Sequence, residues 1–183
     1  MGYHAIGLVE FNSIAKGIEA ADSMLKAAQV ELLFSHTVCP GKYVVLITGD
    51  VAAVENSVQR GKELGAEAVV DDFILPNVHP DVLTAITATS AVQEIESLGV
   101  IETFSLAAAV VAADTAAKAG EVELIEVRLG LGIGGKSFVT LTGEVAAVKA
   151  AVEAGALSAA SKGLLVNQVV IPSPHYNLIP AIM

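Results

Sequence analysis

The 183-residue chain has a formal net charge of −10 at pH 7, which argues against nucleic acid as a partner because such binding needs a basic face. It is 54% hydrophobic with no Trp and 4% aromatic residues, which indicates a core of small side chains or burial against copies of itself. No apolar run approaches the ~20 residues of a spanning helix, and the N-terminus lacks a signal-peptide or myristoylation pattern, so we expect a cytoplasmic protein with no membrane contact.

The first half of the chain predicts strands that alternate with helices. Asn12-Ser13 offers an N-cap, and the apolar residues that follow share one helical stripe, namely Ile14, Ile18, Ala21 and Leu25. Asp50 is expected to cap a second helix, Pro76 to end a strand, and His79-Pro80-Asp81 to begin a short helix. The expected strands cover residues 5–10, 30–38, 43–47 and 68–75, and the two main helices begin near residues 14 and 51.

The second half repeats the first. Ala20-Ala21-Asp22 returns as Ala112-Ala113-Asp114, at an offset of 92. The offset grows to 94 where Lys42 returns as Lys136, and to 96 where His79 returns as His175, so two small insertions explain the drift. Such a repeat indicates a duplicated domain. We predict domains over residues 1–93 and 94–183, joined by the polar stretch of residues 90–97.

Each half therefore reads β-α-β-β-α-β with a short closing helix. This order predicts an α+β protein with two tandem ferredoxin-like domains, each a four-stranded antiparallel sheet with helices on one face. A duplicated small domain often arises where a symmetric ring replaces pairs of subunits by fused ones.

The turn Thr37-Val38-Cys39-Pro40-Gly41-Lys42 holds the chain's one cysteine. A single thiol excludes an intrachain disulfide and cannot hold a metal or a cluster alone. If Cys39 acts chemically, its partners must come from other chains. The alternative is an ordinary buried thiol that behaves as a small apolar side chain.

The equivalent turn of the second half matches a phosphate-binding loop, because Gly130 to Ser137 fits G-x-x-x-x-G-K-S. An NTPase loop of this kind needs a helix that begins at Lys136-Ser137, so that its first amides face the phosphates. The residues that follow, Phe138-Val-Thr-Leu-Thr, predict a strand instead. The NTPase is therefore only a remote alternative, and no carboxylate pair is arranged for acid–base catalysis.

The repeated features together resemble the bacterial microcompartment shell domain. They are the strand at Ala5–Glu10, the Ala-Ala-Asp-x-x-x-Lys-Ala helix, the strand ending Thr48-Gly49-Asp50 and the closing Pro-x-x-His, and they cover nearly the whole chain. The Thr-x-Cys-Pro-Gly-Lys turn is similar to that of the tandem-domain, trimer-forming propanediol-utilisation type. The resemblance implies a non-catalytic, cytoplasmic shell tile.

In that type the turn cysteines of three subunits meet on the threefold axis, so the resemblance implies one [4Fe–4S] cluster per homotrimer, bound by Cys39. It further implies electron transfer across the shell, other shell proteins as partners, and a redox enzyme inside or outside the shell. The implied pore-lining residues are Cys39, Pro40, Gly41, Ile133, Gly134 and Gly135. Lys26 and Lys118 match the lysine at the edge between tiles. An open metabolite pore without a cluster is the alternative.

Several polar residues keep two interpretations. Lys42 and Lys136 are either solvated strand ends or positive charges near the pore. His36 is expected to be solvated or at an edge, facing away from Cys39, because three residues along a strand reverse the side chain's face. His79 and His175 are expected to cap the closing helices.

Overall fold

The computed structural model describes residues 5–130 and 132–182, which form two compact units. One unit contains the chain up to Val78 together with Gly130–Gly135. The other contains His79–Leu129 and the chain from Lys136 onward. Two segments thus fold with the opposite half of the repeat: the second-half turn with the first unit, and the first-half closing helix with the second unit. The predicted boundary between residues 93 and 94 stays a prediction.

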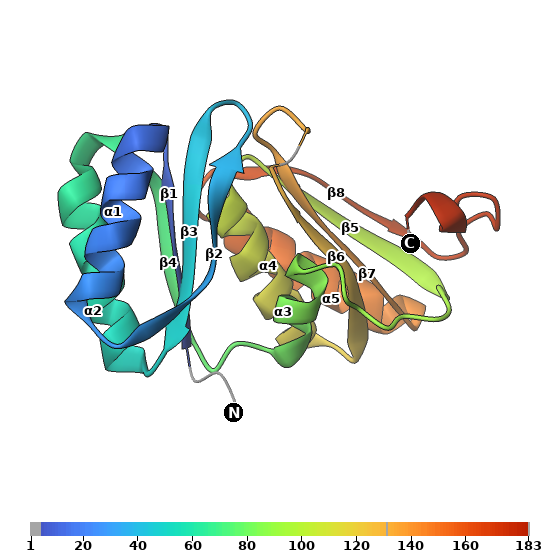
Figure 1. The fold of residues 1–183 in the computed structure, drawn as a ribbon. Helices are drawn as coiled ribbons and strands as arrows, with labels where there is room; N and C mark the ends of the chain where they lie inside the picture. Colours follow the sequence, from blue (N-terminus) through green and yellow to red (C-terminus); the bar gives the residue numbers. More distant parts are fainter. Residues whose placement is uncertain (1–4, 131, 183) are drawn as a thin grey trace. The chain divides into compact units, whose positions relative to one another are not determined.

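The first unit contains the elements predicted from the sequence, with ends shifted by one or two residues (Figure 1). They are β1 (Ala5–Phe11), α1 (Ile14–Ala27), β2 (Val30–Val38), β3 (Lys42–Gly49), α2 (Val51–Gly65), the 3-10 turn η1 (Ala66–Ala68) and β4 (Val69–Pro76). The second unit contains α3 (Pro80–Ile86), β5 (Ser97–Thr103), α4 (Leu106–Ala119), β6 (Val122–Leu129), β7 (Ser137–Gly143), α5 (Val145–Ala160), β8 (Leu165–Ile171) and η2 (Ile179–Ala181).

Each unit is built on one four-stranded antiparallel sheet. The strand order is β2-β3-β1-β4 in the first unit and β6-β7-β5-β8 in the second. The register shifts at equivalent places, between Leu32 and Phe34 and between Leu124 and Glu126. The predicted fold class and the duplication are therefore confirmed in strand order, direction and irregularities.

In each unit two long helices lie together on one face of the sheet (Figure 1). A glycine in the central strand lets one helix approach closely. A Cβ on Gly7 would lie 2.5 Å from Cγ2 of Val58, and a Cβ on Gly99 would lie 2.6 Å from Cγ2 of Val152. Real Cβ contacts are not that short, so the packing of α2 on β1 and of α5 on β5 depends on these two glycines.

The predicted helix caps are only partly right. Ser13 caps α1, since its side chain accepts the N–H of Lys16 at 3.4 Å, and Ser105 caps α4 by accepting the N–H of Ala108 at 2.9 Å. Asp50 stands at the N-cap position of α2 but makes no side-chain cap bond. The position was predicted correctly and the bond was not.

Only one residue of the apolar stripe predicted on α1, Ala21, is buried. Ile14, Ile18 and Leu25 are 39%, 53% and 38% exposed. The other buried positions of α1 are Gly17, Ala20 and Met24. Ala20, Ala21 and Met24 pack with Val54 and Val58 of α2. The sequence pattern shows that a stripe exists but does not show which side of the helix meets the sheet.

Across residues 5–130 and 132–182, the helices are all too short or too polar to span a bilayer.

Candidate pore turns and metal site

Cys39 lies on a tight turn between two strands. β2 ends at Val38, β3 begins at Lys42, and the N–H of Gly41 donates to the carbonyl of Val38 at 3.0 Å. Gly41 has φ +86, a conformation that only glycine adopts without strain. The thiol is free and half-buried. The turn therefore holds the sulfur at a defined place and leaves the side chain partly accessible.

The second predicted pore turn contacts this turn inside the first unit. The N–H of Cys39 donates to the carbonyl of Gly130 at 3.0 Å. Gly135 has φ +81, and a Cβ there would lie 2.7 Å from Cδ of Pro40 and 3.2 Å from the carbonyl oxygen of Cys39. The structure therefore brings Cys39, Pro40 and Gly135 together, so the backbone of the second turn positions the cysteine.

The remaining predicted pore residues lie on the same two turns. Ile133 is half-buried, and Gly134 is exposed with φ +66. No atom lies within 4 Å of a Cβ built on Gly41 or on Gly134, so these glycines are required by their backbone angles and not by crowding within one chain. Whether these residues line a pore stays a prediction, because a pore on an axis needs other copies.

The phosphate-loop interpretation is wrong. The strand β7 begins at Ser137, so no helix N-terminus is available for a phosphate. The side chain of Ser137 is fully buried, and Lys136 donates to the carboxylate of Glu102 at 2.9 Å. The residues that would bind a nucleotide are therefore turned into the fold or engaged elsewhere.

Both lysines that follow the turns form ion pairs with the adjacent central strand. Lys42 contacts the carboxylate of Glu10 at 2.5 Å, where the side chains are 17% and 0% exposed. The equivalent pair, Lys136 with Glu102, is 43% and 33% exposed. Lys42 is therefore not a solvated strand end, whereas Lys136 remains partly exposed. Whether either lysine places positive charge near a pore stays a prediction.

Within residues 5–130 and 132–182, the side chains of one chain do not form a metal site. In the described part of the chain, no three His, Cys, Asp or Glu side chains come together as metal ligands. Iron–sulfur clusters are held by cysteine thiolates, and this chain supplies one. The half-buried sulfur on a glycine-supported turn fits a cluster only if other copies bring their own Cys39 to the same point.

The structure gives the ring of His36 a partner other than the thiol. It lies on the edge strand β2, as expected, but its ring stacks on Phe34 with centroids 4.9 Å apart, and its Nδ1 is buried. Of the two expected places, solvated or at an edge, the structure confirms the edge position, and the ring is half-buried against Phe34 on the same face of the strand.

The predicted tile-edge lysines occupy matching positions in the last turns of α1 and α4. Lys26 pairs with Asp22 at 2.6 Å, and Lys118 pairs with Asp114 at 2.7 Å. The side chain of Asp22 is 63% exposed, whereas that of Asp114 is 6% exposed. Their role at a tile edge stays a prediction.

Sequence reasoning missed the role of Asp114. Its carboxylate accepts the backbone N–H of His79 at 2.8 Å and thereby fixes the start of α3. His79 also caps α3, with Nδ1 accepting the N–H of Asp81 at 3.4 Å, and His175 accepts the N–H of Asn177 at 3.2 Å. The predicted cap is confirmed for His79. It is wrong for His175, because the residues that follow form a turn and then the 3-10 element η2, whose N-cap is Leu178. The repeated Ala-Ala-Asp was the available signal for the aspartate.

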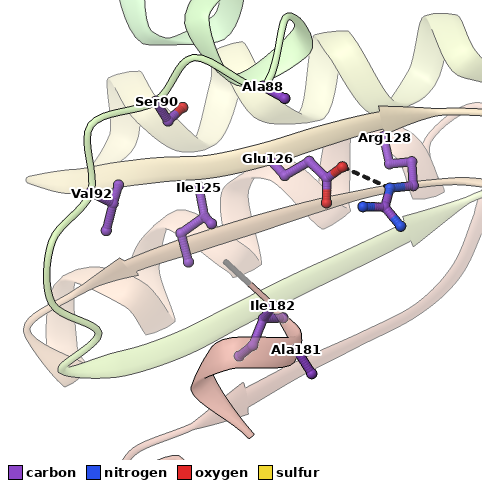
Figure 2. A pocket seen from close by; sticks show the side chains of 8 residues that line it. All are labelled: Ala88, Ser90, Val92, Ile125, Glu126, Arg128, Ala181 and Ile182. Carbon is purple, nitrogen blue, oxygen red and sulfur yellow. Dashed lines mark hydrogen bonds and ion pairs between the residues drawn. The ribbon is translucent and has the colours of Figure 1, made fainter.

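One shallow pocket of about 190 Å³ lies in the second unit, between β6, the connection after α3 and the C-terminal turn (Figure 2). Its lining residues are Ala88, Ser90, Val92, Ile125, Glu126, Arg128, Ala181 and Ile182. Arg128 donates to Glu126 at 2.7 Å, as Figure 2 shows. Because the two charges neutralise each other, the pocket offers a ligand no obvious anchoring charge.

A family model described as the BMC domain matches this chain twice, over residues 5–78 and 97–174. The chain belongs to the BMC domain family. It is a tandem-domain BMC protein and a structural shell protein of bacterial microcompartments, as the resemblance implied.

Three relatives place it within the BMC family. The bacterial microcompartment shell protein PduT of Citrobacter freundii is 46% identical over 174 residues, 95% of each chain. The shell protein EutM of Salmonella typhimurium is 46% identical over 83 residues, which are 45% of this chain and 84% of EutM. A crystal structure of a microcompartment protein from Desulfitobacterium hafniense DCB is 64% identical with a TM-score of 0.89, covering 98% of this chain and 99% of that one.

Proposed function

We propose that three copies of this chain form a flat shell tile, and that the Cys39 thiolates of the three copies hold one [4Fe–4S] cluster on the threefold axis. Two BMC domains per chain support this assembly, because three chains then supply the domains of a pseudo-hexamer. The observation that carries the cluster is the position of the free thiol, which lies where the two predicted pore turns of one chain meet.

The chain's own residues would hold and orient the thiol. The N–H of Cys39 is bound to Gly130, and the close packing of Gly135 against Pro40 restricts the turn further. Three copies supply three thiolates, and the aligned turn with Ile133 supplies no fourth, so one iron would take a ligand from outside the protein. A bound cluster supplies one-electron transfer.

The proposed role is a redox-active plug that carries electrons across the shell or delivers a cluster to an enzyme. Its partners would be other shell proteins and a redox enzyme inside or outside the compartment. A tile whose pore stays open to metabolites is the outcome if the protein takes up no iron.

Assembly is tested by sedimentation. We expect a homotrimer at micromolar concentration. Each chain carries two domains, so a ring of six domains needs three chains, and because the two domains differ in sequence the ring is only pseudo-sixfold. Sedimentation equilibrium across a tenfold range of concentration measures the mass directly. A monomer throughout that range would contradict the proposed tile.

Removing the side chains of the two predicted edge lysines should prevent trimers from assembling side by side into flat layers, here called tile sheets, and should leave each trimer intact. The double variant Lys26→Ala/Lys118→Ala removes the aliphatic stems and charges that pack between tiles. Alanine is preferred to aspartate because Asp22 and Asp114 contact these lysines at 2.6 and 2.7 Å and would meet a like charge. Negative-stain electron microscopy of concentrated protein measures the sheets.

Lys16→Ala is the matched control, since Lys16 lies in α1 and forms an exposed pair with Glu19 at 2.8 Å. This control should form sheets like the wild type. Normal sheets from the double variant would argue against the edge assignment.

A further inference from the structure

The two copies of the repeat differ in how far their edge strands are covered. Leu124 on β6 pairs with Leu141 in the sheet and is 2% exposed. Its counterpart on β2, Leu32, pairs with Ile47 in the same register but is 44% exposed. The same apolar position is therefore a core position in one copy and a surface position in the other.

The first helices of the two copies show the same difference. Leu106 and Val110 on α4 are fully buried. The residues 92 positions earlier, Ile14 and Ile18 on α1, are 39% and 53% exposed. Together with Leu32 they form an apolar surface on α1 and β2, which we call the open face.

In the second unit, α3 packs against both β6 and α4 (Figure 1). Val82 and Ala85 of α3 are fully buried. The carboxylate of Asp114 accepts the N–H of His79 and fixes the point where this helix starts. The closing segment of the first copy, α3, thus covers the surface of β6 and α4 in the second copy. The equivalent surface of the first copy, on β2 and α1, is the open face.

The closing segment of the second copy begins with the same turn as α3. The N–H of Leu178 donates to the carbonyl of His175 at 2.8 Å, as the N–H of Val82 donates to that of His79 at 3.0 Å, but the segment then continues as the 3-10 element η2 and not as an α-helix. Leu178, the counterpart of Val82 at an offset of 96, is 42% exposed, and Ala181, the counterpart of Ala85, is also exposed. The second copy therefore exposes a segment that starts with the same turn as α3 and carries apolar residues at the equivalent places. The first copy exposes the surface equivalent to the one that α3 covers.

We propose that residues 172–182 of one copy dock on the open face of a second copy, in the way that α3 docks on β6 and α4. The carboxylate of Asp22 would accept the backbone N–H of His175 from the other copy, as Asp114 accepts that of His79. One closing segment and one open face per chain make a head-to-tail contact, which closes into a ring when three successive rotations return to the first copy. This inference rests on the proposed ring-shaped tile and identifies what holds its subunits together.

The charges around Asp22 are already arranged for this role. In each helix the lysine lies one turn after the aspartate that it contacts. Lys26 contacts Asp22 at 2.6 Å in α1, and Lys118 contacts Asp114 at 2.7 Å in α4. Asp22 remains 63% exposed, while Asp114 is 6% exposed. Docking of the segment would give Asp22 the burial and the second donor that Asp114 has within the chain.

The test compares variants at the proposed contact between chains with a variant at the equivalent contact within one chain, that of Asp114 with His79. Leu178→Asp and Asp22→Ala should each weaken trimer formation by about 30-fold or more, the effect of losing a central interface residue. Both side chains are exposed in the single chain, so the dissociated variants should unfold at a temperature close to that of wild-type protein diluted until it is also dissociated, because assembly itself shifts apparent stability. Asp114→Ala, the matched control, should instead lower the unfolding temperature of the chain itself. Leu178→Met should assemble normally.

Sedimentation equilibrium and thermal unfolding on the same samples separate the outcomes. Folded Leu178→Asp protein that dissociates while Leu178→Met remains trimeric supports the docking. Trimers of Leu178→Asp and Asp22→Ala as tight as the wild type would overturn the docking and leave the proposed tile standing. A wild type that is itself monomeric would overturn both.

Discussion

Replacing Cys39 with serine should abolish iron–sulfur binding completely and leave the trimer in place. A serine hydroxyl is nearly the same size as the thiol but is not a cluster ligand of the thiolate kind. The turn itself should persist, because its bonds are made by the backbone of Cys39 and Gly41. Visible absorbance and iron and sulfide analysis after anaerobic reconstitution measure the loss, and sedimentation confirms the trimer.

Ile133→Ala is the matched control for this experiment, because Ile133 lies on the second predicted pore turn and offers no ligand atom. It should keep about one cluster per trimer. Because one iron would have no protein ligand, the wild-type protein should also bleach in air. Cys39→Ser protein that retains its absorbance would rule out the proposed ligand.

Replacing Lys42 with methionine should destabilise the protein by about 3–5 kcal/mol, the typical cost of breaking a buried ion pair. The Glu10 carboxylate is fully buried and its lysine partner is 17% exposed, so the variant leaves a buried negative charge without that lysine. Urea unfolding measures the loss, with all variants at one protein concentration because assembly shifts apparent stability.

The second copy of the repeat supplies the control. Lys136→Met breaks the equivalent pair with Glu102, where both side chains are partly exposed, and should cost about 1 kcal/mol or less. The double variant Glu10→Leu/Lys42→Met should recover much of the loss, since no buried charge remains. Equal losses at Lys42 and Lys136 would contradict the argument from burial.

The repeat made the fold predictable from the sequence. Each strand was supported twice, and the aligned strand after Lys42 was enough to reject a phosphate loop at Lys136. The ion pair of Lys42 with Glu10 was not predictable at the same level. It joins residues 32 apart that meet because β1 and β3 are neighbours in the sheet, where Glu10 pairs with Val44.

The misjudged stripe on α1 has a different cause. Helical periodicity locates apolar residues around a helix but does not show what covers them. The small residues Ala20 and Ala21 face α2, while the larger Ile14 and Ile18 face outward. The counterparts of Ile14 and Ile18 on α4, Leu106 and Val110, are buried. The apolar stripe therefore marks buried positions in the second copy. In the first copy it marks the open face instead.

The most direct test of the proposed tile is a native mass spectrum of the anaerobically reconstituted protein. It reads the number of chains and the bound cluster from the same particle. We predict one dominant species whose mass equals three chains plus one [4Fe–4S] cluster, which disappears in favour of the bare trimer for Cys39→Ser. A wild-type trimer with no added mass after reconstitution would contradict the cluster and favour the open-pore tile, and a monomer would contradict the assembly itself.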